Sequence, residues 1–445
     1  MGARLNAEGA DKIRMKSLLW LLLVALFSTP AFSQSGDALQ DKAKTIAFTN
    51  GNWFDGRSFH SKTGYSVNGV LSFRRPSHVD SVVDLGNGFV VPPFGEAHNH
   101  NVEPLNKIDA LIQRYLAHGI FYVKDPDNLP KGRDQVLPKI NRPDSIDVIF
   151  SNGGFTGPSG HPAELVKRNI DRGIWTEADG DGAFYYTVSD EAELERKWPA
   201  FLATKPDFVK TFLLFSDEYA VRKSDPKYFG WTGLDPTLLK SIVQRAHAAG
   251  LRVSTHVESA ADFHSALVAG VDEINHLPGF RTTGDVKTHA LSEFQISESD
   301  VKFAARHGVY VVTTLADAAH ANPDGTLNDR DELNRRNLTL LKKYRVRLAL
   351  GSDNYRGDTL PEALYIESLH VFDTSALLKL WSTSTARAIF PHRKIGELKE
   401  GNEASFVVLK GNPIQDFSAV QHVSIGVKEG HVLQLDSQPN GAPQR

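Results

Sequence analysis

Two histidines separated by one residue are the clearest sign of chemistry in this sequence. His98 and His100 end the run FVVPPFGEAHNH, which is typical of a β-strand and the turn after it. Residues i and i+2 of a strand point to the same side, so both imidazoles can bind one metal ion. The chain contains 17 histidines, and a His-x-His pair by itself is a weak signal. The pair becomes informative through the residues that accompany it.

Three further strand-like runs place a metal-ligating side chain near their carboxyl ends. His256 stands in RVSTHV, His276 in EINHL and Asp353 in RLALGSD. A single histidine at a strand end is more often a structural, hydrogen-bonded residue. Four runs that all end in such side chains favour a metal site, because the carboxyl ends of parallel strands meet at one side of the sheet.

Lys210 lies among apolar residues in another strand-like run, DFVKTFLLF. A buried ammonium group must be paired or lose its charge, because desolvation disfavours the charged form. A salt bridge with a nearby acid such as Asp217 or Glu218 is the simplest explanation when this residue is considered alone.

Eight strand-like runs alternate with helical segments between residues 92 and 390. This alternation predicts a parallel α/β sheet, and eight units over this length match a (β/α)8 TIM-type barrel. An open doubly wound sheet is the alternative, but no glycine-rich dinucleotide motif follows the first run. The runs are FVVPPFGEAHNH, IFYVKD, DVIFSNG, DFVKTFLLF, RVSTHV, EINHL, VYVVTTL and RLALGSD.

Both ends of the chain show a different pattern. Residues 45–91 and 391–437 consist of short apolar runs separated by turn signals such as Asn-Gly. We expect these two segments to pair into one small β-sandwich domain beside the barrel.

Residues 1–33 have the composition of a secretory signal peptide. Basic residues precede an apolar run from Leu18 to Phe27, and the small-x-small triplet Ala31-Phe32-Ser33 follows. The run is too short to span a bilayer as a helix. We therefore expect cleavage, export to the periplasm or the exterior, and no membrane attachment afterwards. Met15, directly before Lys16, would also start a compact signal peptide, and the sequence does not decide between Met1 and Met15.

The composition excludes several classes of function. The formal net charge is −3 and no long basic run occurs, so nothing indicates binding of nucleic acid. The chain has no cysteine, which excludes disulfides and thiolate metal sites. A metal would be bound by histidine, carboxylate or a modified side chain, a ligand set that suits zinc, manganese, iron or cobalt. The expected partner is a small molecule, and homo-oligomerisation is left open.

The order of these residues resembles the amidohydrolase superfamily. That family has His-x-His after the first barrel strand, Lys after the fourth, His after the fifth and sixth, and Asp after the eighth. The flanking stretches DLGNGFVVPPFGEAHNH and STSTARAIFPHRKIGELKEGNEASFVVLKGNP resemble the start and the end of its barrel. The resemblance covers nearly all of residues 45–435. Glu96 departs from the family's pattern, which often has Asp at this position, and Asn101 follows the second histidine; neither change removes a ligand.

The resemblance implies six metal ligands for two divalent ions, most simply zinc. The predicted ligands are His98, His100 and Asp353 for the more buried metal, His256 and His276 for the more exposed metal, and Lys210, carboxylated by CO2, as the bridge between them.

The expected reaction is hydrolysis of an amide, peptide or cyclic amide C–N bond. Water shared by two such ions loses a proton near neutral pH, and the exposed ion would polarise the substrate carbonyl. Asp353 would orient the hydroxide and carry its proton to the leaving group.

Other functions fit parts of the same pattern. A mononuclear deaminase is the first alternative, because Glu258 stands two residues after His256, where it would share that residue's side of the strand or lie on a surface loop. Hydrolysis of a lactone or phosphoester on the same site is the second. A barrel that binds but does not catalyse is the third, although such proteins usually lose metal ligands, and all six are present here.

Substrate contacts are expected from loops that follow the strands. The candidates are His161, Arg222, Tyr355 and Arg356. Either arginine would suit a dipeptide-like substrate, because a guanidinium group binds a carboxylate through two parallel hydrogen bonds.

Overall fold

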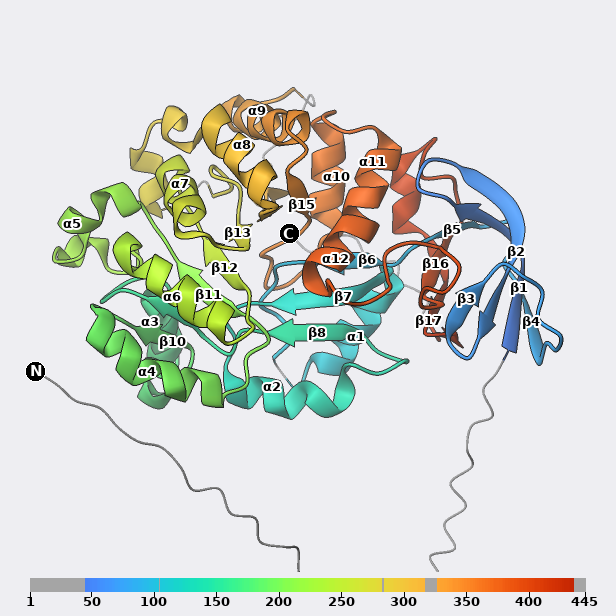
Figure 1. The fold of residues 1–445 in the computed structure, drawn as a ribbon, viewed down its shortest axis with the longest axis horizontal. Helices are drawn as coiled ribbons and strands as arrows, with labels where there is room; N and C mark the ends of the chain where they lie inside the picture. Colours follow the sequence, from blue (N-terminus) through green and yellow to red (C-terminus); the bar gives the residue numbers. More distant parts are fainter. Residues whose placement is uncertain (1–44, 104, 282–283, 317–325, 436–445) are drawn as a thin grey trace, which may run out of the picture. The chain divides into compact units, whose positions relative to one another are not determined.

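Short parallel strands and helices alternate through the middle of the chain (Figure 1). The computed structural model describes residues 45–103, 105–281, 284–316 and 326–435. The predicted signal peptide, residues 1–33, lies outside the described residues. Each of the eight strand-like runs contains a strand of the structure. These strands are β6 (Phe94–Glu96), β7 (Ile120–Asp125), β8 (Asp147–Phe150), β11 (Val209–Phe212), β12 (Val253–His256), β13 (Glu273–Asn275), β14 (Tyr310–Val312) and β15 (Arg347–Ala349).

The strands of this part form two parallel sheets. One has the order β6-β7-β8, and the other has the order β10-β9-β11-β12-β13-β14-β15, in which β9 (Gly154–Thr156) and β10 (Tyr185–Thr187) are additions between β8 and β11. Backbone hydrogen bonds link segments that are far apart in the sequence. The N–H of Ala97 donates to the carbonyl of Leu350 at 2.8 Å, and the N–H of Asp353 donates to the carbonyl of His98 at 2.8 Å. The residues after β6 therefore lie beside the residues after β15.

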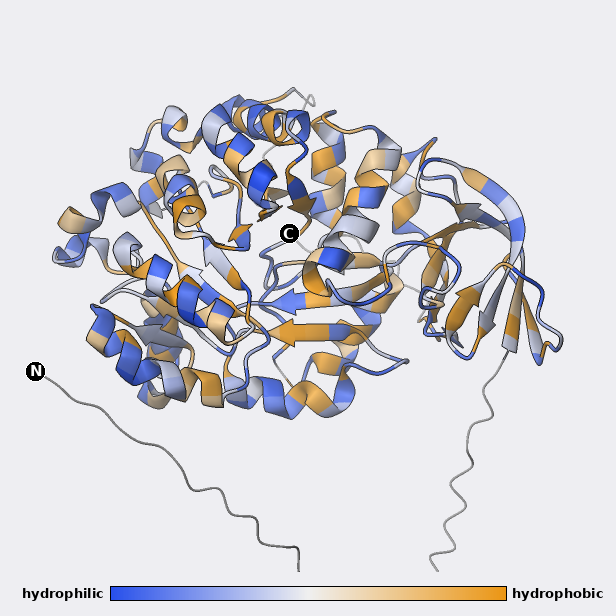
Figure 2. Ribbon diagram, in the orientation of Figure 1, coloured by the Kyte–Doolittle hydropathy of each residue, from blue (hydrophilic) through white to orange (hydrophobic). Residues whose placement is uncertain are grey.

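Helix α6 (Pro236–Ala248) shows how the sequence covers these strands. Asp235 caps its first turn by accepting a hydrogen bond from the N–H of Thr237, and Pro236 occupies the first helical position. Its buried residues recur at helical spacing, as in Leu239, Ile242 and Val243, so one face packs inward. The strands beneath are buried along both faces, and Figure 2 shows β8 mostly in hydrophobic colours.

Helix α7 (Ala260–Ala269) begins and ends at signals that the sequence also carries. Ser259 and Asp262 form a reciprocal capping box at its start. Gly270 ends the helix with a φ of 86°, a conformation that glycine adopts without steric cost. The other helices are α1 (Ile108–Ala117), α2 (Pro130–Val136), α3 (Ala163–Asp171), α4 (Glu191–Ala203), α5 (Tyr219–Arg222), α8 (Glu298–His307), α9 (Asp329–Lys343), α10 (Leu360–Ser368), α11 (Thr374–Lys379) and α12 (Thr385–Ile389). Among the described helices, none has the length and apolar character that crossing a membrane requires.

Strands from both ends of the chain form one further sheet. Its order is β18-β17-β16-β5-β1-β2-β3, and β4 pairs with β1. The two ends meet where β5 pairs with β16 in antiparallel orientation. This sheet consists of β1 (Thr45–Phe54), β2 (Phe59–Val67), β3 (Val70–Ser72), β4 (Ser81–Asp84), β5 (Phe89–Val91), β16 (Phe406–Leu409), β17 (Val423–Lys428) and β18 (His431–Val432).

Trp381 fixes the position of the strand that precedes the two histidines. Its ring stacks on Phe94 of β6 with a centroid distance of 3.8 Å, and its Nε1–H donates to the carbonyl of Gly95 at 3.0 Å. Both contacts are buried. The start of the first barrel-type strand is therefore held by a residue nearly 300 positions further along the chain.

Candidate active site

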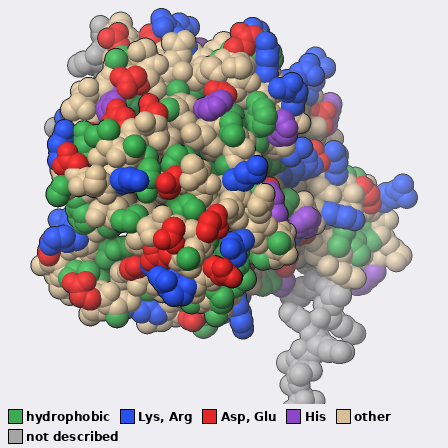
Figure 3. Space-filling view, turned by 60° about the vertical axis from the view of Figure 1, so that its left-hand side comes forward, with side chains coloured by type: hydrophobic (Ala, Val, Ile, Leu, Met, Phe, Trp, Pro, Cys, Tyr) green, Lys and Arg blue, Asp and Glu red, His purple; other side chains and the backbone are tan. Residues whose placement is uncertain are grey.

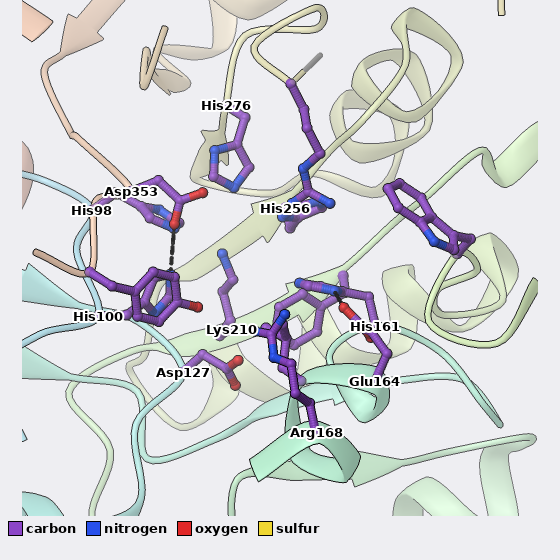
Figure 4. Close-up of a pocket in the computed structure, with 15 residues that line it drawn as sticks. His98, His100, Asp127, His161, Glu164, Arg168, Lys210, His256, His276 and Asp353 are labelled. Atoms are coloured by element: carbon purple, nitrogen blue, oxygen red, sulfur yellow. Dashed lines mark hydrogen bonds and ion pairs between the residues drawn. The ribbon is translucent and has the colours of Figure 1, made fainter. Parts of the chain in front are cut away.

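The six predicted ligands line one cavity of about 250 Å³ (Figure 4). His98 and His100 follow β6, Lys210 lies in β11, His256 ends β12, His276 follows β13 and Asp353 follows β15. Five strands therefore direct nitrogen and oxygen ligands toward the same space, as is usual at the carboxyl ends of strands in barrel enzymes.

Three of these residues come close enough to bind one ion. The Nε2 atoms of His98 and His100 lie 3.2 Å apart, and Asp353 Oδ1 lies 3.1 Å from His100 Nε2 and 3.8 Å from His98 Nε2. Two imidazole nitrogens and a carboxylate oxygen that converge in this way fit a transition-metal ion. The buried Nδ1 atoms of both histidines have no hydrogen-bond partner among the described residues, so the polar contacts of these two rings are made through Nε2, toward each other and Asp353.

The backbone and the electrostatics of the site both suit ligation. His276 and Asp353 have φ values of 74° and 50°, which are uncommon for residues other than glycine and often occur at functional sites. Burial lowers the pKa of His98, His256 and His276 well below the usual value, so these rings are neutral, the form that binds a metal. Burial would raise the pKa of Asp353, but its hydrogen bond with His100 leaves it below the usual value, so this group is a carboxylate.

His276 and His256 continue the cluster away from His98. The ring centroids of His98 and His276 lie 4.6 Å apart, and those of His276 and His256 lie 4.5 Å apart. His276 Nδ1 forms a 2.8 Å hydrogen bond with the hydroxyl of Thr314, which fixes the orientation of its ring. The second pair of predicted ligands thus stands directly beside the first.

Lys210 is buried and makes no salt bridge within the described part of the chain. Its Nζ donates to Asn275 Oδ1 at 2.7 Å, and burial lowers its pKa to about 7. Pairing with Asp217 or Glu218 is not its role, because Asp217 is exposed and Glu218 forms an ion pair with Arg222. The amine therefore faces the cavity with a neutral hydrogen-bond acceptor as its partner.

A network of buried polar side chains holds Asn275, the hydrogen-bond partner of Lys210, in position. Asn275 Nδ2 donates to Glu273 Oε1 at 2.8 Å, and the same oxygen accepts from the Nζ of Lys124 at 2.5 Å and from the hydroxyl of Ser254 at 2.9 Å. Sequence reasoning missed this network. The signal was the presence of Lys124 and Glu273 within otherwise apolar strands.

Two of the four predicted substrate contacts line the cavity. His161 lies there with its Nδ1 2.6 Å from Glu164 Oε1, and the exposed ring of Tyr355 lies 5.2 Å from the ring of His100. The structure places Arg222 and Arg356 outside the residues that line it. Arg222 is buried, and its two terminal nitrogens form ion pairs with Glu218 and Asp285, both at 2.7 Å.

Glu258 is a buried group and not a surface-loop carboxylate. Its side chain is 1% exposed, and its Oε2 lies 3.3 Å from His256 Nε2. Its other oxygen, Oε1, lies 3.8 Å from Nε of Arg281. Glu96, where the family often has Asp, is also buried; it accepts hydrogen bonds from the hydroxyl of Ser352 at 2.7 Å and from the N–H of His98 at 3.2 Å.

Several cavity residues were not identified from the sequence. They are Asp127, Glu164, Leu165, Arg168, Phe212, Trp231 and Arg281. Asp127 follows β7 by two residues, so the rule that found the histidines at strand ends would have found it. Burial raises its pKa well above the usual value, and its Oδ1 has no hydrogen-bond partner among the described residues. Arg281 lies five residues after His276 and carried no such signal.

Comparison with known proteins agrees with this architecture. A model described as the amidohydrolase family matches residues 208–433. The fold is similar to those of three solved hydrolases, each 16% identical in sequence. The first is A. niger ochratoxinase, with a TM-score of 0.68 over 88% of this chain and 95% of that chain. The second is a Xaa-Pro dipeptidase with bound methionine, with a TM-score of 0.65 over 88% of this chain and 100% of that chain. The third is molinate hydrolase, with a TM-score of 0.66 over 91% of this chain and 99% of that chain. These similarities indicate a TIM-barrel-type α/β fold. No curated protein sequence matches the chain.

Proposed function

We propose that this chain, which belongs to the amidohydrolase family, is an exported enzyme that uses two divalent metal ions to cleave an amide, peptide or cyclic amide bond. Family membership makes it a metal-dependent hydrolase acting on C–N bonds. The observation that carries the proposal is the meeting of six ligating side chains in one cavity. Export follows from the predicted signal peptide.

We infer that the two parallel sheets belong to one (β/α)8 barrel, made of residues 92–390. Support comes from the hydrogen bonds that join the residues after β6 to those after β15, and from the 2.8 Å bond between the N–H of Asp207 and the carbonyl of Phe150, which links β8 to the segment before β11. We further infer that residues 45–91 and 391–437 pack as a small β-sandwich domain, because their strands already share one sheet.

The ligand assignment divides the six residues into two groups and a bridge. His98, His100 and Asp353 would hold one ion, His256 and His276 would hold the other, and a carboxylated Lys210 would lie between them. When bound, the ions would supply a hydroxide near neutral pH and polarise the scissile carbonyl. Zinc suits this nitrogen and oxygen ligand set, as do manganese, iron and cobalt.

The protein's own groups complete the chemistry. The N–H of Asp353 donates to the carbonyl of His98 at 2.8 Å, which holds its carboxylate over the His98 and His100 pair. A carboxylate in this position can accept a proton from the attacking water and deliver it to the departing nitrogen. A cavity of about 250 Å³ lies just below the range of roughly 300–1,000 Å³ that is usual for ligand pockets, so it suits a small substrate of dipeptide size.

Metal content tests the two-ion site. The wild type, purified without chelator, should contain about two metal ions per chain, and Lys210→Ala should lower this number sharply. Lys240→Ala is the matched control, because Lys240 is an exposed lysine of α6. A value of about one ion that does not change in Lys210→Ala would contradict the bridge and favour the mononuclear deaminase.

Hydrolysis tests the reaction class. Release of free amine from a panel of dipeptides, N-acyl amino acids and cyclic amides should be abolished in His98→Ala and in Asp353→Asn. Full activity in either variant would show that the site is not the one described here. Export is tested separately by sequencing the N-terminus of the exported protein, which should begin directly after Ser33.

A further inference from the structure

Arg281 is a cation in the cavity to which the metal site gives no role. It lines the cavity together with His256, His276 and Asp353. The nearest acid is Glu258, whose Oε1 lies 3.8 Å from Arg281 Nε, too far for a hydrogen bond. A guanidinium group has five N–H donors. Among the described residues, none accepts a hydrogen bond from this side chain, so its donors are available to a ligand.

Aromatic rings hold the guanidinium in place. Its Cζ lies 5.2 Å from the ring centroid of Phe280 and 5.6 Å from that of Trp231, within the range of cation–π attraction. Phe280 in turn stacks on His276 with a centroid distance of 4.1 Å. The side chain of Arg281 is only 23% exposed, so water screens its charge less than on the open surface. The cation is therefore positioned before a substrate arrives.

Glu258 links this cation to the reaction centre. One of its oxygens lies 3.3 Å from His256 Nε2 and the other lies 3.8 Å from Arg281 Nε. Only the side chain of Glu258 thus lies between Arg281 and the predicted metal ligand His256. In an N-acyl amino acid or a dipeptide, the carboxylate carbon is two bonds from the amide nitrogen, so the charge and the scissile bond fit within this short span.

We propose that Arg281 binds the carboxylate of the substrate and restricts the enzyme to amides whose nitrogen belongs to an amino acid. The inference rests on the proposed function for the bond that is cleaved, and it adds the class of substrate. The guanidinium would form two parallel hydrogen bonds to the carboxylate. Leu165, Phe212 and Trp231 offer apolar surface in the same cavity for the amino-acid side chain.

Other cations explain such a preference less well. Arg168 also lines the cavity, but it is exposed on α3, and in Figure 4 it lies on the side of His161 and Glu164. Lys210 belongs to the metal set. The face drawn in Figure 3 mixes basic and acidic side chains, which agrees with a formal net charge of −3. Within the cavity, Arg281 is therefore the cation best placed to bind an anion.

Matched substrates test the proposal. The first is an N-acyl amino acid that the enzyme cleaves, and the second is the same amide with a methyl group in place of the carboxylate. The wild type should prefer the first by about 100-fold in kcat/KM, as expected for hydrogen bonds to a charged group. Arg281→Met should reduce this ratio to below about tenfold and leave kcat/KM for the methyl analogue within about threefold. Arg281→Lys should give an intermediate ratio, because lysine keeps the charge but not the planar fork.

A matched control and a binding measurement complete the design. Arg356→Met removes an exposed arginine that does not line the cavity, so its ratio should equal that of the wild type. Calorimetry with the amino-acid product should show a Kd that rises at least about tenfold in Arg281→Met and stays unchanged in Arg356→Met. Metal content and the melting curve show whether each variant is folded.

The outcomes separate the two proposals. Equal cleavage of both substrates by the wild type, or an equal loss for both in Arg281→Met, would overturn the role of Arg281 and leave the hydrolase function standing. Binding of the amino acid that depends on Arg281, without cleavage of any amide, would support the carboxylate site and overturn the hydrolase. Neither binding nor cleavage would overturn both.

Discussion

Breaking the buried ion pair of Lys124 and Glu273 should destabilise the protein far more than removing both partners together. Both side chains are 2% exposed, and Nζ lies 2.5 Å from Oε1. The pair also supports the cavity, because Glu273 accepts from Asn275, which accepts from Lys210. The perturbation is a set of three variants: Lys124→Met, Glu273→Gln, and the two changes combined.

The magnitude follows from the cost of an unpaired buried charge. At an effective dielectric constant near 20, two such charges attract each other by on the order of 5 kcal/mol, and desolvation offsets most of this. Glu273→Gln leaves the ammonium of Lys124 unpaired, and we expect a loss of about 3–5 kcal/mol. The loss of stability cannot much exceed about 5 kcal/mol, because at that point Lys124 would release its proton. This is the free energy needed at pH 7 to deprotonate a lysine with the ordinary pKa of 10.5.

The opposite variant should cost less. Lys124→Met leaves a carboxylate that still accepts hydrogen bonds from Ser254 and Asn275. The loss of stability in Lys124→Met should not exceed about 3 kcal/mol. This is the free energy needed at pH 7 to protonate a glutamate with the ordinary pKa of 4.5, after which no charge remains buried. In the double variant the glutamine can keep both hydrogen bonds and no charge is left unpaired. The two single losses should therefore exceed the double loss by at least about 2 kcal/mol.

Urea unfolding at pH 7, followed by tryptophan fluorescence and by circular dichroism, measures these free energies. The exposed pair of Lys139 and Asp109, 2.7 Å apart, provides the control cycle, and its coupling should stay below about 1 kcal/mol. A coupling below about 0.5 kcal/mol for Lys124 and Glu273 would refute the reasoning, since two independent sites would give that result.

Three further predictions concern the pH dependence of Lys124 and two other parts of the structure. Burial lowers the pKa of Lys124 to about 8, so between about pH 8 and 10.5 the unfolded chain binds more protons than the folded chain. The free energy of unfolding should therefore rise by up to about 3 kcal/mol as the pH rises through this range. Lys124→Met should flatten this part of the curve of unfolding free energy against pH. Gly351→Ala would place a Cβ 2.7 Å from Cβ of His98, so we expect its metal content to fall by at least about half and its free energy of unfolding to fall by about 1–3 kcal/mol. An unchanged metal content would show that the backbone there yields without moving His98. Trp381→Phe removes an N–H that donates to the carbonyl of Gly95 and to the hydroxyl of Thr359, and urea unfolding should show a loss of about 1–3 kcal/mol. A loss under about 0.5 kcal/mol would show that the hydroxyl of Thr359, which also donates to this carbonyl, satisfies it alone.

Much of the secondary structure could be predicted because its signals are local. Alternation of apolar runs placed all eight strands between residues 92 and 390, and helices such as α6 (Pro236–Ala248) lie between them, as the alternation predicted. Capping residues and prolines act within a few positions of themselves, so their effect is visible in the sequence. Pairing of the two chain ends was predicted from their shared pattern of short strands and turns.

The candidate ligands could be predicted for a related reason. A side chain near the carboxyl end of a parallel strand reaches the same side of the sheet whatever the loops do. His98, His256, His276 and Asp353 all follow this rule, and all line the cavity. Asp127 follows it too and was overlooked, although Lys124 and Asp125 stand in the strand before it.

The loops were decided only by the tertiary structure. Arg222, a predicted substrate contact, is buried against Asp285, sixty-three residues further along the chain, and Arg281, which carried no signal, takes a place in the cavity. Glu258 had two equally acceptable environments until the structure placed it between His256 and Arg281. The sequence by itself determined which strands carry ligands, because strand geometry is periodic and local. Which charges meet in the cavity depended on long-range packing, because the direction of a loop is set by residues that are distant in the chain.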